Sequence, residues 1–455
     1  MMETPGSAAA TADRYRAIGL RQIAAHPLWE RLPADIREGV EVVSQVLPFR
    51  TNSYVLDLVD WDDVPDDPMF QLTFPQRGML AAGDFREIAD LVRAGADAAA
   101  LRDAANTIRL RLNPHPAGQL THNVPELDGR ELQGLQHKYR ETVLYFPAQG
   151  QTCHAYCTYC FRWAQFVGMP DLKFEARDSG DLVAYLGRHP EVSDLLVTGG
   201  DPMIMTTAAL EKHLEPVLAP ELAHVQSIRI GTKSLAYWPA RFVTDKDADD
   251  LLRFFERAIA AGRHVALMAH FSHPRELGSD LVREAIRRIR ATGVEIRMQA
   301  PLVKRVNDRP SAWARMWRDG VKLGLIPYYM FVERDTGPKN YFEVPLARAY
   351  QVFREAYQQV SGLARTVRGP SMSATPGKVK VSGVQTVAGE KVFLLEFLQA
   401  RNPLWVKRPF FAKFDPRATW FDQLRPAFGE DHFFFDGVRE RDESERKLLT
   451  MPVAV

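Results

Sequence analysis

From about residue 140 onward, short apolar and β-branched runs alternate with longer stretches of helical period. The apolar runs predict strands at residues 143–146, 194–199, 225–231, 264–271, 294–302 and 326–332. Each intervening stretch predicts a crossover helix, so the strands should form a parallel sheet with right-handed connections. Six such units make an α/β fold of the partial (β/α)6 barrel kind, open on one side. In parallel barrels the chemistry lies at the carboxyl ends of the strands.

The regions on either side of this core have a different texture. The first 139 residues predict a helical and irregular region, with helical periodicity at 36–47 and 85–108 and a Pro- and Asp-rich loop at 61–79. Residues 341–455 are rich in aromatic side chains and show no clear period. We therefore expect an N-terminal region (1–139), a barrel core (140–340) and a C-terminal extension (341–455) that packs on the barrel and contributes to oligomer contacts.

The charge balance narrows the classes of partner. Lys and Arg number 58 and Asp and Glu number 57 in 455 residues, which gives no reason to expect nucleic acid or an anionic membrane as a partner. The N-terminal stretch lacks the apolar core of a secretory signal, and no apolar run approaches the length of a membrane span. The sequence predicts a cytoplasmic protein.

The only three cysteines are Cys153, Cys157 and Cys160, in C-x3-C-x2-C spacing directly after the first predicted strand. This clustering is unlike a disulfide framework. Three close thiolates can hold a 4Fe-4S cluster and leave one iron open to bind S-adenosylmethionine (SAM) and deliver an electron that cleaves it. The alternatives are three buried thiols or a zinc site, but zinc needs a fourth ligand and His154 is poorly placed to supply one.

Several segments, in order, resemble one family. The sequence is similar to radical SAM enzymes of the lysine 2,3-aminomutase type over roughly residues 137–338. The similarity lies at residues 137–146, 195–205, 228–241, 268–277, 303–308 and 327–331. It implies a radical SAM barrel, and it implies that the three cysteines ligate the cluster.

The resemblance also implies residues that bind SAM. Tyr159 takes the place of a residue near the adenine, and the segment Thr198, Gly199, Gly200 and Asp201 matches the one that supports the SAM amino group. The alternative for this segment is a purely structural role, as a tight strand-to-loop turn. His270, His273 and Gln299 fall at strand ends facing the expected site, where structural roles compete with cofactor contact.

Two residues match substrate contacts of the aminomutases. Arg162 matches an arginine that pairs with the substrate carboxylate, a task suited to a bidentate guanidinium. Asp335 matches an aspartate that holds the distal amino group of the substrate. The competing interpretations are a surface salt bridge for Arg162 and a loop cap for Asp335.

The match to the pyridoxal phosphate (PLP) site of the family is partial. The Schiff-base lysine corresponds to Lys378 or Lys380, but the glycine run before it is shortened and Ser373 replaces an aspartate. Tyr139 matches a PLP-contacting tyrosine, whereas Lys138 and Thr142 stand where arginines would grip the phosphate. The alternative for both lysines is a solvated strand.

Three functions therefore stay open. The first is a 2,3-aminomutase-type isomerase that uses the 4Fe-4S cluster, SAM, PLP and an external one-electron reductant, in a chain that forms a homo-oligomer. The second is a PLP-independent radical SAM enzyme acting on another substrate, and the third is a non-catalytic iron–sulfur protein. Asp335 favours a diamino or guanidino acid over glutamate, while the loss of the second acidic partner argues against lysine itself.

Overall fold

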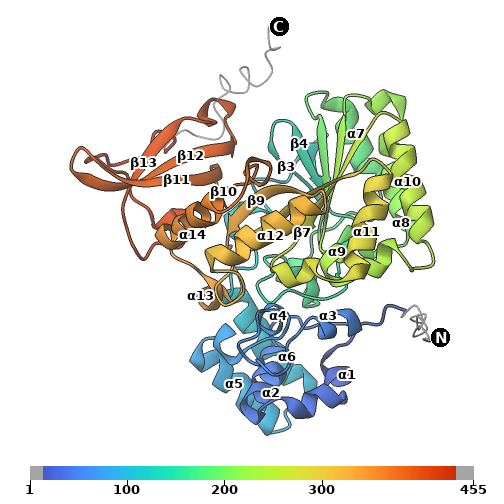
Figure 1. The fold of residues 1–455 in the computed structure, drawn as a ribbon, viewed down its shortest axis with the longest axis vertical. Helices are drawn as coiled ribbons and strands as arrows, with labels where there is room; N and C mark the ends of the chain where they lie inside the picture. The colour runs from blue at the N-terminus through green and yellow to red at the C-terminus, as the bar shows by residue number, and fades with distance from the viewer. Residues whose placement is uncertain (1–13, 437–455) are drawn as a thin grey trace, which may run out of the picture.

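A computed structural model describes residues 14–436 and centres on one 11-stranded mixed sheet (Figure 1). Its order is β13-β12-β11-β10-β9-β8-β7-β6-β5-β4-β3. The six predicted strands are confirmed as consecutive parallel neighbours: β4 (Thr142–Tyr145), β5 (Asp194–Val197), β6 (Ser227–Thr232), β7 (His264–His270), β8 (Glu295–Leu302) and β9 (Ile326–Val332). The α/β class and the parallel core follow from the alternating pattern.

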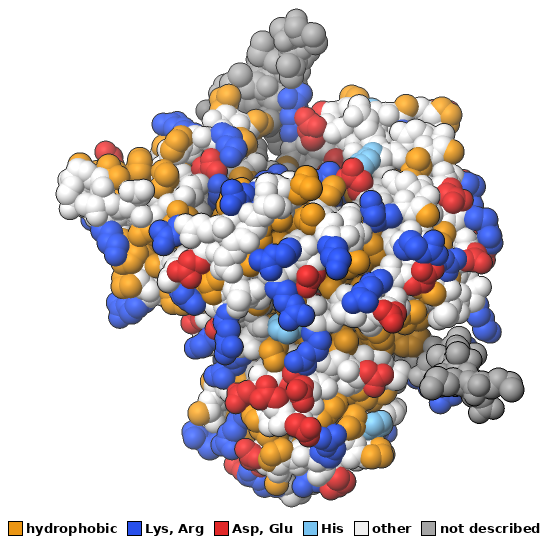
Figure 2. Space-filling model, viewed as in Figure 1, with side chains coloured by type: hydrophobic (Ala, Val, Ile, Leu, Met, Phe, Trp, Pro, Cys, Tyr) orange, Lys and Arg blue, Asp and Glu red, His pale blue; other side chains and the backbone are white. Residues whose placement is uncertain are grey.

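The five predicted crossover helices are also present. They are α7 (Gly180–Arg188), α8 (Thr207–Leu214), α10 (Ala248–Ala260), α11 (Asp280–Ala291) and α12 (Pro310–Lys322). In α10 the buried side chains Leu251, Phe254, Phe255 and Ala258 recur at helical spacing, so one stripe packs on the sheet while charged residues face outward. Figure 2 shows basic and acidic side chains interspersed over these helices.

Five more strands of the structure extend the parallel core or flank it, and the hydrophobic pattern did not predict them. β3 (Leu135–Tyr139) pairs antiparallel with β4, while β10 (Arg368–Ser373) pairs parallel with β9. β11 (Gly377–Val387), β12 (Glu390–Ala400) and β13 (Pro409–Lys413) continue as an antiparallel meander. The C-terminal extension thus continues the sheet of the core, and its aromatic side chains form a second apolar cluster around Phe393, Phe397 and Phe410.

The N-terminal region is mainly helical and lies below the parallel core in Figure 1. It contains α1 (Leu20–Ala24), α2 (Ala34–Val43), α3 (Ser53–Asp57), α4 (Pro68–Thr73), α5 (Ala82–Arg93) and α6 (Ala98–Arg111). A two-residue hairpin, β1 (Glu126–Leu127) and β2 (Arg130–Glu131), precedes β3. The remaining helices are α9 (Ser234–Tyr237), α13 (Lys339–Phe342) and α14 (Leu346–Gln358). Within residues 14–436, every helix is too short or too polar to cross a membrane.

Candidate functional site

A cavity of about 330 Å³ opens at the carboxyl ends of the parallel strands. Its wall combines the cysteine loop with residues from β3, from the strand ends of the core, and from β10, β11 and β12. The strands that the hydrophobic pattern missed therefore complete the site. Most of the predicted site residues line this one cavity: Tyr139, Cys153, Cys157, Tyr159, Cys160, Arg162, Thr198, Gly199, Gly200, His270, Gln299 and Lys378.

The three cysteines carry free thiols in the loop after β4, and all three line the cavity. Burial raises the pKa of Cys160 to about 12 and that of Cys153 well above its usual range, and the neighbouring thiols raise both further. Three adjacent thiolates thus need a cationic partner, and an iron–sulfur cluster supplies one. Among residues 14–436, no three His, Cys, Asp or Glu side chains converge closely enough to hold a single metal ion.

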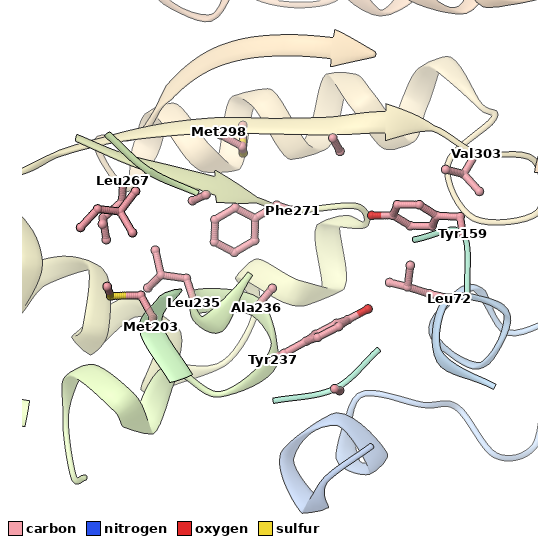
Figure 3. Close-up of a cluster of buried hydrophobic side chains, with 14 of the residues drawn as sticks. Leu72, Tyr159, Met203, Leu235, Ala236, Tyr237, Leu267, Phe271, Met298 and Val303 are labelled. Carbon is pink, nitrogen blue, oxygen red and sulfur yellow. The ribbon is translucent and has the colours of Figure 1, made fainter. Parts of the chain in front are cut away.

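The N-terminal region clamps the cysteine loop. The Asn52 side-chain amide donates to the carbonyl oxygens of His154 and Tyr237, both at 3.1 Å. The backbone N–H of Thr158 donates to the Leu72 carbonyl at 2.9 Å. Figure 3 shows Tyr159 lying near Leu72 and Val303, with Tyr237 below. The loop is therefore fixed by segments of the N-terminal region, which lies outside the parallel core.

His154 has a structural role in this clamp. Its Nδ1 lies 2.9 Å from the Ser234 hydroxyl, and burial lowers its pKa to about 3. A neutral imidazole held against α9 does not face the cavity wall formed by the cysteines. His154 is not among the residues that line the cavity.

The glycine pair after β5 permits close packing against the cysteine loop. A Cβ on Gly200 would lie 2.4 Å from the Thr152 carbonyl oxygen, and one on Gly199 would lie 2.1 Å from the Gln151 side-chain nitrogen. Gly199 also has a φ of +142°, which L side chains rarely adopt. Only glycine allows this strand end to reach the loop that carries Cys153.

Asp201 does not line the cavity with the preceding residues. Its carboxylate accepts hydrogen bonds from the backbone N–H groups of Met203 and Lys233, at 3.0 and 2.8 Å, and from the Ser234 hydroxyl at 3.0 Å. The side chain thus fixes the loop after β6. Contact of Asp201 with a cofactor stays a prediction.

His270 and Gln299 form a pair inside the cavity wall. Their Nε2 atoms lie 2.9 Å apart, and burial lowers the pKa of His270 to about 3. The imidazole is therefore neutral and accepts a hydrogen bond from the Gln299 amide. His273 lies outside the lining residues, and its Nδ1 accepts from the Arg275 backbone N–H at 3.3 Å.

Arg162 lies in the wall beside Cys160. Its side chain is buried, its guanidinium carbon lies 4.2 Å from the centre of the Phe146 ring, and its Nε has no hydrogen-bond partner among the described residues. Burial lowers the pKa of Arg162 to about 9. A buried guanidinium with unused donors fits a carboxylate in the cavity.

The end of β9 supplies two cavity residues that the sequence did not single out, Glu333 and Arg334, while Asp335 lies outside the lining. Burial raises the pKa of Glu333 well above its usual range. The Asp335 carbonyl accepts from the Asn113 side chain at 2.7 Å. Glu333 and Arg334 directly follow the apolar run 326–332. Their position at the end of a predicted strand was the signal in the sequence that could have identified them.

The two candidate PLP lysines occupy different environments. Lys378 lines the cavity, its ammonium nitrogen lies 4.4 Å from the centre of the Tyr329 ring, and burial lowers its pKa to about 7. Lys380 lies outside the lining and forms an ion pair with Glu396 at 3.2 Å. Tyr139, Lys138 and Ser373 share the wall with Lys378.

Comparison with known proteins gives the family. No family profile matches the chain. A protein of Aquifex aeolicus (strain VF5), provisionally named an L-lysine 2,3-aminomutase, is 30% identical over 409 residues, covering 90% of this chain and 96% of that protein. The L-lysine 2,3-aminomutases of Escherichia coli (strain K12) and Bacillus subtilis (strain 168) are 28% and 24% identical, covering 53% and 67% of this chain and 68% and 67% of their own.

Two solved structures show weaker likeness. Streptococcus suis SuiB bound to S-adenosylmethionine has a TM-score of 0.34 at 13% identity, covering 59% of this chain and 56% of that one. A radical SAM methyltransferase from Sphaerobacter thermophilus has a TM-score of 0.36 at 15% identity, covering 64% of this chain and 94% of that one. On the sequence relatives, whose similarity extends over most of its length, this chain belongs to the lysine 2,3-aminomutase-like family of radical SAM enzymes.

Proposed function

We propose that this protein is an amino acid isomerase of the 2,3-aminomutase type, working in a partial (β/α)6 barrel. One observation carries the proposal: Cys153, Cys157, Cys160, Arg162 and Lys378 line a single cavity at the carboxyl ends of the parallel strands. A cluster site, a carboxylate-binding guanidinium and a reactive amine are the three parts that this chemistry needs.

The cysteine side of the cavity fits a 4Fe-4S cluster and SAM. When bound and reduced by an external one-electron donor, the cluster supplies the electron that cleaves SAM to methionine and a 5′-deoxyadenosyl radical. The three thiolates would hold the cluster, while Tyr159 and the Thr198–Gly200 segment form the adjoining wall. The buried apolar side chains Ala155, Tyr159 and Trp163 pack around this wall.

The opposite wall fits PLP. When bound, PLP would supply an aldehyde that forms a Schiff base with an amino group and so stabilises a migrating nitrogen. Lys378 would attach it, because a buried amine with a pKa near 7 has a large unprotonated fraction at neutral pH. Tyr139 and Lys138 lie on the same wall and would contact the ring and the phosphate.

The proposal is tested by anaerobic reconstitution. The protein should take up about four irons per chain, absorb broadly near roughly 400 nm and, with dithionite as reductant, cleave SAM to 5′-deoxyadenosine. Cys157→Ser should abolish both iron loading and cleavage. A fully loaded wild-type protein that leaves SAM intact would rule out the proposed function.

A second candidate is a PLP-independent radical SAM enzyme. It is favoured by the cavity wall itself, where Lys138 and Thr142 stand in place of phosphate-gripping arginines. Borohydride reduction after incubation with PLP separates the two. A stable adduct mapped to Lys378 supports the aminomutase, and its absence from a protein that still cleaves SAM supports the second candidate.

A further inference from the structure

The residues that line the cavity include more basic side chains than acidic ones. Its six basic side chains are Lys138, Arg162, Arg229, Lys233, Arg334 and Lys378. The Arg229 guanidinium pairs with Asp194, and the Lys233 ammonium lies 2.7 Å from a Glu276 carboxylate oxygen. The Lys138 ammonium donates to the Ala374 carbonyl at 2.5 Å. Arg162 and Arg334 are permanent cations that lack such a close partner within residues 14–436.

Arg162 and Arg334 lie around one aromatic ring. Their guanidinium carbons are 5.3 and 5.6 Å from the centre of the Phe161 ring. The Nε atoms of both are buried without a hydrogen-bond partner among the described residues. The nearest carboxylate oxygen to Arg334 is Asp335 Oδ1, which lies 3.8 Å from its Nε, beyond hydrogen-bond distance.

The acidic groups of the wall do not offset these charges. Among the described lining residues, Glu333 is the single Asp or Glu, and no hydrogen bond or ion pair joins its carboxyl to either arginine. Asp335 does not reach the cavity. Arg162 is buried and the Arg334 side chain is 18% exposed, and two guanidinium charges beside one ring cost free energy until anions pair with them.

We infer that the cavity selects an amino acid with a second carboxylate in its side chain, bound at one end by Arg162 and at the other by Arg334. This inference rests on the proposed function and names its substrate class. Each carboxylate can accept two hydrogen bonds from one guanidinium. The distal ammonium of a diamino acid would instead meet the Arg334 charge, so the substrate differs from that expected from Asp335 alone.

The test measures equilibrium binding to holoenzyme loaded with cluster, SAM and PLP, without reductant. Isothermal titration calorimetry should show L-glutamate or L-aspartate binding at least about tenfold more tightly than L-lysine. Arg334→Gln should weaken binding of the dicarboxylic acid by about 10- to 100-fold. Arg334→Lys should restore part of that loss, and Arg334→Glu should shift preference toward L-lysine.

Arg348→Gln provides the matched control, because this half-buried arginine on α14 lies outside the cavity lining and its guanidinium donates to the Asp308 carbonyl at 3.4 Å. It should leave all three affinities unchanged. Tighter binding of L-lysine to the wild type would overturn the inference, as would a change of preference caused by Asp335→Asn instead of the Arg334 variants. Loss of bound PLP in Arg334→Gln, with L-glutamate affinity intact in the PLP-loaded fraction, would assign Arg334 to the phosphate and overturn it too.

Failure of the proposed function would show differently. In that case the reduced protein would form no 5′-deoxyadenosine with any amino acid. The preference between L-glutamate and L-lysine is measured without reductant, so it does not depend on that result. The two results are therefore independent.

Discussion

At the scale of single residues, the site depends on which side chains reach the cavity and which are held by the protein. Lys378 and Lys380 are two positions apart on β11, yet only Lys378 lines the cavity, and Lys380 forms an ion pair with Glu396. The sequence makes both lysines equally good candidates for the Schiff base, because the alternation KVKV places them on one face of the strand. The difference comes from Glu396 on the neighbouring strand, which no local pattern reveals.

The buried amine of Lys378 predicts a pH effect on stability. Its pKa falls from 10.5 to about 7, so between these values the unfolded chain binds a proton that the folded chain does not. The free energy of unfolding should therefore gain a contribution as pH rises from about 7 toward 10, and that contribution is absent below pH 7. Lys378→Met should remove this slope and raise stability at pH 7 by about 1 kcal/mol or more.

Urea unfolding of the apo-protein at several pH values checks this prediction. Lys380→Met is the matched control. Lys380 forms a partly exposed ion pair with Glu396, worth about 1 kcal/mol at most, so this variant should keep the rise of unfolding free energy with pH. An unchanged slope in Lys378→Met would show that this amine titrates normally.

At the scale of elements, the parallel core was predictable and the added strands were not. In strands β4 to β9 one set of side chains is buried and the alternating set is buried or half-buried apart from the exposed His264, and amphipathic helices flank the strands, so their apolar runs stand out in the sequence. In β11 the buried residues Val379 and Val381 alternate with lysine and serine, and the segment that follows has aromatic residues scattered along it. These added strands pair with the next strand along the chain, apart from β10, which also pairs in parallel with β9, and their stability depends on cross-strand packing that periodicity does not report.

The glycine pair after β5 predicts a sharp local effect. Gly200→Ala places a methyl group against the Thr152 backbone, which cannot move without shifting the cysteine loop. We expect a loss of about 1–3 kcal/mol of unfolding free energy and a lower iron content after reconstitution. Thermal unfolding of the apo-protein and iron analysis of the loaded protein measure the two effects.

Gly187→Ala is the control for this substitution. Gly187 lies in α7, with no atom within 4 Å of the added methyl group, so the change should stabilise the chain by about 0.5–1 kcal/mol and leave iron content unchanged. Equal iron content in Gly200→Ala and wild type would contradict the role given to the close packing.

At the scale of the whole molecule, three parts of the chain build one site. The N-terminal helices hold the cysteine loop, the core strands supply most of the wall, and the C-terminal strands bring Lys378. The seam between the last and first parts is joined by Arg401, which donates to the Asn123 side chain at 2.7 Å. The division into regions at residues 139 and 340 stays a prediction, since sequence texture alone defines it.

The contacts between the N-terminal region and the cysteine loop predict that cluster retention depends on a residue outside the parallel core. Asn52→Leu removes the donor to the His154 and Tyr237 carbonyls; the His154 carbonyl keeps the Tyr15 hydroxyl at 3.0 Å, while the Tyr237 carbonyl loses its donor, a cost of about 1–3 kcal/mol. The reconstituted variant should lose iron faster than the wild type under a chelator. Asn106→Leu, on α6, should match the wild type, and equal rates for both variants would contradict the clamp.

The central claim is that an amino acid lies in the cavity as hydrogen donor to the SAM-derived radical. The most direct measurement supplies uniformly deuterated L-glutamate, L-aspartate or L-lysine to the reduced holoenzyme and analyses 5′-deoxyadenosine by mass spectrometry. Deuterium in the 5′-deoxyadenosine made with a dicarboxylic amino acid, and little with lysine, is the expected result. Abundant 5′-deoxyadenosine without deuterium from any of the three amino acids would contradict it.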